Sequence, residues 1–138
     1  MIHQHTPGPV SGSLILGINH FFHDCSACLV EEGRLTVALE EERFSRVKHT
    51  TAFPKIAIAR CLQFAGRQPQ DITDIAVSIS PWLHASRKLW YGLRLGRDSG
   101  PFFRQEFISA RGKLREFHKW LEHTWPDPRQ RPRSDMVE

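Results

Sequence analysis

Two short segments of the chain hold the residues that could do chemistry. Residues 20–26, "HFFHDCS", place two imidazoles, a carboxylate and a thiol between two apolar runs. Residues 46–49, "RVKH", add two cations and a third imidazole. An imidazole titrates near neutral pH and can take a proton from a hydroxyl group, and a lysine can neutralise phosphate charge. If the fold brings the segments together, they could combine proton transfer with binding of a phosphate-bearing ligand.

Both segments also have simpler structural explanations. His23 could be a solvent-exposed turn residue beside Asp24, a residue type that favours turns. Lys48 could lie in a solvated basic loop that pairs with residues 40–42, which are all glutamate. Exposed ion pairs of this kind contribute only about 0 to 1 kcal/mol each. Residue types alone therefore do not distinguish a site from ordinary loops.

Apolar patterns on either side of the first segment predict the strands that would position it. Residues 13–19, "SLILGIN", are apolar on both faces, which is typical of a central strand covered on both sides. Residues 26–31 and 34–40 predict an antiparallel hairpin. Glu32 and Gly33 would form its tight turn, with Gly33 free to adopt a positive φ. The loop from residue 19 to residue 25 would then link the first two strands.

A helix and a fourth strand follow. Residues 40–53 lack a clean period, and we interpret them as a strand end that runs into a loop. Pro54 suits a first helical turn, where no amide donor is needed, and Gly66 would end the helix. The apolar face of this helix would comprise Ile58, Cys61, Leu62 and Ala65. Residues 71–80 include a strand at 75–79, so the order of elements predicts an α/β fold with a mixed sheet and helices on its faces.

The last part of the chain has a different character. Residues 81–125 are basic and aromatic, and within them residues 101–125 show helical spacing, although Gly112 weakens the middle by about 1 kcal/mol relative to alanine. The apolar face of that helix would comprise Phe103, Phe107, Leu114, Phe117 and Leu121. Residues 126–138 contain three prolines and no core-forming residues, which predicts a disordered tail. Residues 1–12 are expected to form a flexible leader.

Composition indicates a globular protein without a membrane segment. Of 138 residues, 40% are hydrophobic and 25% are charged. No run approaches the roughly 20 apolar residues that span a bilayer. The three cysteines, an odd number, and the lack of a signal-peptide pattern at the start predict free thiols in a reducing cytoplasm.

Positive charge is concentrated in the second half of the chain. Residues 1–80 contain seven Lys or Arg and eight Asp or Glu, whereas residues 81–133 contain twelve and five. Such a basic region could contact nucleic acid, phosphates or an acidic partner, or it could be a solvated helical face. Because no nucleic-acid-binding signature accompanies the aromatic side chains of residues 87–104, we do not expect a nucleic-acid partner.

Cys25 and Cys28 have the C-x-x-C spacing that can indicate a metal or redox site. Residues three apart on a strand point to opposite faces of the sheet. No second cysteine pair is present to complete a tetrahedral zinc site. We therefore expect these thiols to fill space, with no metal site.

The motifs of residues 14–80 resemble the amino-terminal part of the NodU/CmcH-type O-carbamoyltransferases. The resemblance is carried by a strand with "LG", by "HD" at residues 23–24, by the hairpin and by "EERFSRVKH" at residues 41–49. "AFPKIAIARCLQFAG" and "DITDIAVSIS" fit the next helix and strand of the family. The joint occurrence of "HD" and "EERFSRVKH" at this separation makes the match specific.

The resemblance implies both a fold and a reaction. The fold would be part of the actin-like ATPase, or ribonuclease H-like, type that is related to tRNA threonylcarbamoyladenosine synthases. In the family, carbamoyl phosphate and ATP yield carbamoyl-adenylate, and a hydroxyl group of a small molecule then accepts the carbamoyl group. His23 matches the active-site histidine of the family, so His23 and Asp24 are expected to be catalytic. Lys48, assisted by Arg46 and His49, is expected to bind the nucleotide or pyrophosphate.

The chain departs from the family pattern after residue 82. The resemblance implies a divalent metal, magnesium or iron, held by a His-x-x-x-His pair and an Asp, and it implies a YrdC-like domain. His118 and His123 are five residues apart and would point about 140° apart on a helix, so they are poor joint ligands. His20 has no counterpart in the pattern and is expected to be a loop residue.

These departures predict the front part of an enzyme. We expect the chain to be inactive alone and to depend on a missing carboxy-terminal portion or a partner subunit that completes the site. The alternative is a non-catalytic binding or regulatory subunit that has kept the same fold.

Overall fold

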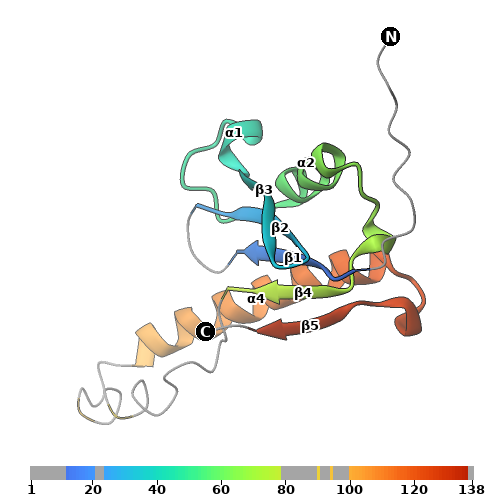
Figure 1. Cartoon of the computed structure of the whole chain (residues 1–138). Helices are drawn as coiled ribbons and strands as arrows, with labels where there is room; N and C mark the ends of the chain where they lie inside the picture. The colour runs from blue at the N-terminus through green and yellow to red at the C-terminus, as the bar shows by residue number, and fades with distance from the viewer. Residues whose placement is uncertain (1–11, 21–23, 79–89, 91–93, 95–99, 137–138) are drawn as a thin grey trace.

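Five strands form one mixed sheet in the part of the chain that the structure describes (Figure 1). This computed structural model describes residues 12–20, 24–78, 90, 94 and 100–136, with only the backbone of residues 100–110 and 136. The strands are β1 (Leu14–Asn19), β2 (Ser26–Glu31), β3 (Arg34–Glu40), β4 (Asp74–Val77) and β5 (Arg133–Met136). Their order is β3-β2-β1-β4-β5; β2 is antiparallel to β1 and β3, and β4 is parallel to β1 and β5. The predicted α/β fold with a mixed sheet is confirmed.

The hairpin between β2 and β3 turns where the sequence predicts. Glu32 and Gly33 have φ angles of 49° and 77°. Positive φ at both positions is the requirement of the type I′ turn, whose twist suits a two-residue hairpin. The three strands of this first half are confirmed to within one residue. Ile79, the predicted end of the fourth strand, lies outside the described residues.

Three α-helices and two short 3-10 helices accompany the sheet in the described residues. They are α1 (Glu42–Ser45), α2 (Lys55–Ala65), η1 (Pro69–Asp71), α4 (Gly100–Thr124) and η3 (Pro128–Gln130). The helix predicted after Pro54 is confirmed by α2, which ends at Gly66 with a φ of 64°. The expectation of an irregular loop over residues 40–53 is corrected by α1. One turn of helix forms there before Arg46 ends it with a φ of 57°.

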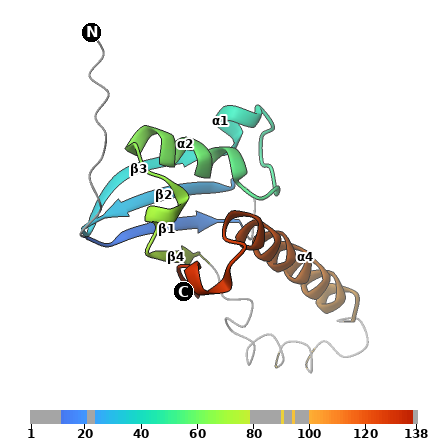
Figure 2. The ribbon, with the colours of Figure 1, turned by 90° about the vertical axis from the view of Figure 1, so that its right-hand side faces the viewer.

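One face of the sheet carries the hydrophobic core. Leu16 pairs with Leu29 and with Ile75, so these three side chains point to the same side. Helix α2 covers this side (Figure 2), and three side chains at the carboxyl end of α4 and just after it join the same buried cluster. The buried cluster comprises Leu14, Leu16, Ile18, Ala27, Leu29, Phe53, Ala57, Ile58, Cys61, Leu62, Ile72, Ile75, Val77, Phe117, Leu121 and Trp125.

Helix α4 lies at the end of the sheet toward which β1 points (Figure 2). It confirms the predicted carboxy-terminal helix. Phe117 and Leu121 of its predicted apolar face are buried, and Leu114 is half-buried. The side chains of Phe103 and Phe107 lie outside the described residues. Neither α4, at 25 residues, nor any other described helix is apolar enough over a sufficient length to cross a membrane.

The predicted disordered tail is wrong for most of residues 126–138. Both η3 and β5 lie in this segment, and β5 pairs in parallel with β4. The Arg133 amide donates to the Thr73 carbonyl at 3.3 Å, and Arg131 Nε donates to the Trp125 carbonyl at 3.1 Å. Composition fails here because backbone pairing holds this strand at the sheet edge, where polar side chains can stay exposed. The predicted leader lies outside the described residues apart from Gly12.

Candidate functional site

The carboxyl ends of β1, β3 and β4 lie at the same edge of the sheet, because these strands run in the same direction. Asn19 ends β1, Glu40 ends β3, and Ser78 directly follows β4. The two segments that hold the candidate reactive residues begin near this edge, one after β1 and the other after β3 and α1. Ligands of open α/β sheets bind outside the carboxyl ends of the parallel strands. This edge is therefore the candidate site.

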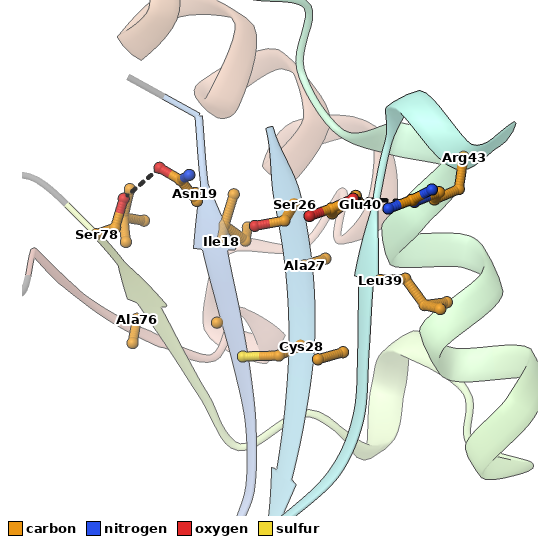
Figure 3. Close-up of a pocket in the computed structure, with 13 residues that line it drawn as sticks. Ile18, Asn19, Ser26, Ala27, Cys28, Leu39, Glu40, Arg43, Ala76 and Ser78 are labelled. Carbon is orange, nitrogen blue, oxygen red and sulfur yellow. Dashed lines mark hydrogen bonds and ion pairs between the residues drawn. The ribbon is translucent and has the colours of Figure 1, made fainter. Parts of the chain in front are cut away.

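Hydrogen bonds at this edge connect β4, β1 and the loop after β1. The Ser78 hydroxyl donates to Asn19 Oδ1 at 2.9 Å (Figure 3). Asn19 Nδ2 in turn donates to the Asp24 carbonyl at 3.2 Å. Asn19 thus restrains the backbone that presents Asp24. The sequence does not single out Asn19, because an asparagine that follows a strand is equally typical of a simple turn.

The two motif segments meet through Asp24 and His49. His49 Nδ1 lies 3.0 Å from Asp24 Oδ1, within hydrogen-bonding distance, although the residues are 25 apart in sequence. The side chains remain exposed, at 54% for Asp24 and 75% for His49. Both backbones have a positive φ, 65° and 52°, which is uncommon outside glycine but tolerated by Asp and His. The His49 amide also donates to Glu42 Oε2 at 3.4 Å.

A buried layer of contacts lies directly beneath this exposed pair. Cys25 follows Asp24, and its thiol donates to the carbonyl of Thr50, which follows His49, at 3.2 Å. The Glu41 amide donates to the Cys25 carbonyl at 2.8 Å. Cys25 is almost fully buried, and burial raises the pKa of its thiol. This cysteine therefore serves the fold, since the reactive thiolate form is disfavoured.

Glu41 has a structural role that the sequence does not reveal. Its carboxylate accepts hydrogen bonds from the amides of Ala57 at 2.7 Å and Ile56 at 3.3 Å. These amides belong to the first turn of α2, where donors lack helical partners and the helix dipole favours a negative charge. Glu41 is only 5% exposed. A glutamate among three consecutive glutamates gives no signal of this role, because the capped helix begins fourteen residues later.

His20 lies in the loop after β1, as predicted, but it is buried, with 1% of its surface accessible. Its ring packs edge-on against Phe53 with centroids 5.0 Å apart, and its Nε2 lies 3.3 Å from Glu116 Oε2. Burial lowers the pKa of the His20 imidazole, Glu116 opposes that effect, and Lys113 adds to it. His20 thereby links the end of β1 to helix α4.

The structure brings some of the predicted site residues together. Asp24 and His49 are in contact. Arg46 and Lys48 are exposed and belong to the same short segment as His49. His23 lies outside the described residues, so its position beside Lys48 stays a prediction.

The face of the sheet opposite the core has an open hollow of about 750 Å³ (Figure 3). A row of small residues on four adjacent strands forms its floor: Ala76, Gly17, Cys28 and Ala38. The neighbouring row at the carboxyl edge is polar: Ser78, Asn19, Ser26 and Glu40. Arg43 Nε lies 3.0 Å from Glu40 Oε2 at the rim (Figure 3). The predicted site residues that the structure describes do not line this hollow. The hollow and the candidate site therefore meet only at Asn19, at the edge of the sheet.

The three cysteines are free thiols in different surroundings, as the sequence predicts. Cys61 is fully buried, donates to the Ala27 carbonyl at 3.4 Å, and has its thiol pKa raised by burial to about 11. Cys28 faces the hollow and packs across Gly17. A Cβ atom at Gly17 would come within 2.5 Å of Cys28 Sγ, so this close approach requires glycine.

Several relatives match the first part of this chain. Nodulation protein NolNO of Sinorhizobium fredii is 47% identical over 58 residues, which are 42% of this chain and 8% of that protein. An uncharacterized protein of Synechocystis, sll1178, is 39% identical over 75 residues, 54% of this chain and 12% of that protein. An uncharacterized 19.2 kDa protein from the syrM 5′ region of Rhizobium etli is 45% identical over 58 residues, 42% of this chain and 34% of that protein. The chain thus spans about a third or less of the length of these relatives.

A solved structure and a protein-family model also match this chain. YeaZ from Pseudomonas aeruginosa is similar with a TM-score of 0.39 and 21% identity, over 50% of this chain and 30% of YeaZ. The fold described above rests on the strand order and pairing of this chain itself. The family model for the carbamoyltransferase N-terminus matches residues 14–111, which include both motif segments. The chain therefore belongs to the carbamoyltransferase N-terminus family.

Proposed function

We propose that the chain is the amino-terminal portion of an ATP-dependent O-carbamoyltransferase of the cytoplasm. Family membership supports carbamoyl transfer. The contact between Asp24 and His49 is the observation on which the proposed site depends, because it joins the "HD" and "KH" segments at one edge of the sheet. Carbamoyl phosphate, ATP and water would yield carbamoyl-adenylate, phosphate and pyrophosphate, and a hydroxyl group of a sugar or secondary metabolite would then accept the carbamoyl group.

Each predicted site residue has a role in this proposal. The acceptor oxygen attacks the carbamoyl carbon, the bond from that carbon to the adenylate phosphate oxygen breaks, and AMP leaves. His23 takes the proton of the acceptor hydroxyl as general base, with Asp24 beside it. Lys48 and Arg46 offset the negative charge of the leaving phosphate, and His49 supplies a further contact to the bound intermediate.

The metal of the proposed reaction requires residues from elsewhere. Among the described residues, no group of three or more His, Cys, Asp or Glu side chains is placed to hold a metal ion. His118 and His123 are both exposed on α4, five residues apart. The described residues therefore do not fit a magnesium or iron site, and we assign no step of the reaction to a metal.

Further polypeptide is also part of the proposal. The region matched here is 8% of NolNO and 12% of sll1178, so these relatives extend far beyond it. We propose that a carboxy-terminal portion or a partner subunit supplies the sites for carbamoyl phosphate and metal. The chain alone would then be inactive.

An assay of carbamoyl transfer tests this function. The chain, joined to the polypeptide that completes it, is given ATP, labelled carbamoyl phosphate and a panel of hydroxyl acceptors. The His23→Ala variant should lose about 10²- to 10⁴-fold in rate, the usual worth of a general base. His123→Ala is the matched control, since it removes an exposed histidine of α4 that is not among the predicted site residues. Absence of transfer by the completed wild-type protein contradicts the function, and undiminished transfer by His23→Ala contradicts the role of His23.

The second candidate is a non-catalytic binding or regulatory subunit. The open hollow favours this candidate, because a sheet face that no described helix covers, with a floor of small residues, could receive a partner. In that case both His23→Ala and Lys48→Ala would leave the activity of the assembled protein unchanged. Bulky substitution at Ala38, on the hollow floor, would instead weaken the assembly.

A further inference from the structure

Two neighbouring contacts join the loop after β1 to the segment after α1. Asp24 Oδ1 lies 3.0 Å from His49 Nδ1. One residue further along each segment, the Cys25 thiol donates to the Thr50 carbonyl at 3.2 Å. The first contact is exposed and the second is partly buried. The two segments are therefore joined both at the surface and beneath it.

The partly buried contact joins the two segments independently of the exposed one. Cys25 also accepts a hydrogen bond from the Glu41 amide at 2.8 Å, and buried hydrogen bonds are costly to lose. An exposed carboxylate–imidazole contact adds little stability. Asp24 and His49 both adopt positive φ angles, which Asp and His tolerate better than most non-glycine residues. Orientation of the imidazole explains the exposed contact better than stability does.

We propose that Asp24 is a positioning residue that holds the His49 imidazole in one tautomer and one orientation. Nδ1–H donates to Asp24 Oδ1, so a hydrogen bond from His49 to a ligand is made by Nε2. In a neutral ring of this tautomer Nε2 is an acceptor, which suits an N–H or O–H group of the ligand rather than a phosphate oxygen. Phosphate charge is left to Lys48 and Arg46.

This inference rests on the proposed function and names the group that His49 recognises. The hydrogen-bond donor is either the carbamoyl NH₂ group or the hydroxyl of the acceptor. Both donors come close to the carbamoyl carbon during transfer, so one oriented acceptor atom can serve either. The experiments below distinguish the two.

Imidazole nitrogen NMR on the 138-residue chain tests the tautomer without an activity assay. The His49 signals are assigned with a His49→Gln variant. Wild-type His49 should carry its proton on Nδ1 when neutral, and Asp24→Gly should shift it toward the Nε2-protonated form. Glycine accepts a φ of 65°, so this variant removes the carboxylate without adding strain. A wild-type His49 protonated at Nε2, or a tautomer that does not respond to Asp24→Gly, overturns the proposal.

Glu32→Gly is the matched control. Glu32 is also an exposed acidic residue with a positive φ, 49°, but it lies in the hairpin turn away from the site. Its replacement should leave the His49 signals and carbamoyl transfer unchanged. A response of His49 to Glu32→Gly as large as that to Asp24→Gly would mean that a general change of charge, not the contact, sets the tautomer.

Kinetics of the completed enzyme test the positioning role. Asp24→Gly should lower kcat about 10- to 100-fold, the scale expected when a reacting group is misplaced. An accompanying rise in KM for carbamoyl phosphate identifies the carbamoyl NH₂ as the donor, and a rise in KM for the acceptor identifies the hydroxyl. Unchanged kcat in Asp24→Gly overturns the positioning role while the proposed function stands. If the wild type itself transfers no carbamoyl group, the proposed function fails with the role, and the NMR result alone decides whether Asp24 sets the tautomer.

Discussion

The loop after β1 and the segment after α1 meet in a buried layer and in an exposed layer, and the two layers serve different ends. In the buried layer, Cys25 binds Thr50 and Glu41. In the exposed layer, Asp24 contacts His49. Adjacent residues alternate between the layers, since Cys25 follows Asp24 and Thr50 follows His49. The same short segments therefore hold the fold together and present the site.

This comparison predicts which substitutions affect stability and which affect chemistry. Changes in the buried layer and the core beneath it should lower the free energy of unfolding. Changes in the exposed layer should leave that free energy almost unchanged and alter the site alone. The predictions below run from the largest expected effect on stability to the smallest.

Phe53→Ala should have the largest effect. Phe53 is 5% exposed, and its ring packs against His20, Phe117 and Trp120 at centroid distances of 5.0, 6.4 and 5.5 Å. Loss of a buried aromatic ring costs about 3–5 kcal/mol. Urea unfolding measures the loss. Phe64→Ala is the matched control, because Phe64 is 66% exposed and should change the free energy of unfolding by about 0.5 kcal/mol or less.

Glu41→Ala should destabilise the protein by about 1–3 kcal/mol, because it leaves the first amides of α2 without their acceptor. Glu40→Ala removes a neighbouring carboxylate that is exposed and paired with Arg43, and it should cost less than about 1 kcal/mol. Thermal unfolding of both variants measures the difference. Equal losses for Glu40→Ala and Glu41→Ala would contradict the division into layers.

Stability should fall as His20 becomes protonated in acid. Burial holds the folded-state pKa of His20 below its ordinary value of 6.5. Protons therefore bind the unfolded chain more readily. The stabilising contribution of neutral His20 is complete above about pH 6.5 and is lost as the pH falls through the lower folded-state pKa. For one proton the slope cannot exceed about 1.4 kcal/mol per pH unit.

Two variants sharpen this prediction. His20→Gln should flatten the dependence of the free energy of unfolding on pH between about pH 7 and 5. Glu116→Gln should steepen it, because Glu116 raises the pKa of His20. Denaturant unfolding at several pH values measures the slopes. A wild type no steeper than His20→Gln would show that burial of His20 does not govern this range.

Asp24→Gly should have the smallest effect on stability, within about 1 kcal/mol, because the contact that it removes is exposed. His49→Gln should change the free energy of unfolding equally little. Denaturant midpoints of both variants compared with wild type check this expectation. A loss as large as that of Glu41→Ala would mean that the exposed pair is part of the structural anchor.

Local sequence signals predict the first three strands, their hairpin and helix α2. The hairpin follows from Gly33, which supplies a positive φ, and the end of α2 follows from Gly66. The apolar face of α2 follows from helical spacing, which predicts burial of Ile58 and Cys61. These features depend on neighbours within a few residues, and such signals survive in a single sequence.

The features that the sequence did not predict depend on distant partners. Glu41 caps α2 from sixteen residues before Ala57, and β5 is held by the edge of β4 some sixty residues earlier in the chain. Buried His20 contacts Phe53 and Glu116, which lie far away in the sequence. The contact between Asp24 and His49 likewise joins residues that are far apart in the sequence. Family motifs indicated both segments, but only the fold pairs these two residues.

A double-mutant cycle on carbamoyl transfer by the completed enzyme tests most directly whether Asp24 and His49 act as one unit. The cycle compares Asp24→Gly, His49→Gln and the double variant. We predict that the double variant is about as slow as the slower single variant, because either substitution already breaks the contact. Rate losses that multiply, as they do for independent residues, would contradict the account.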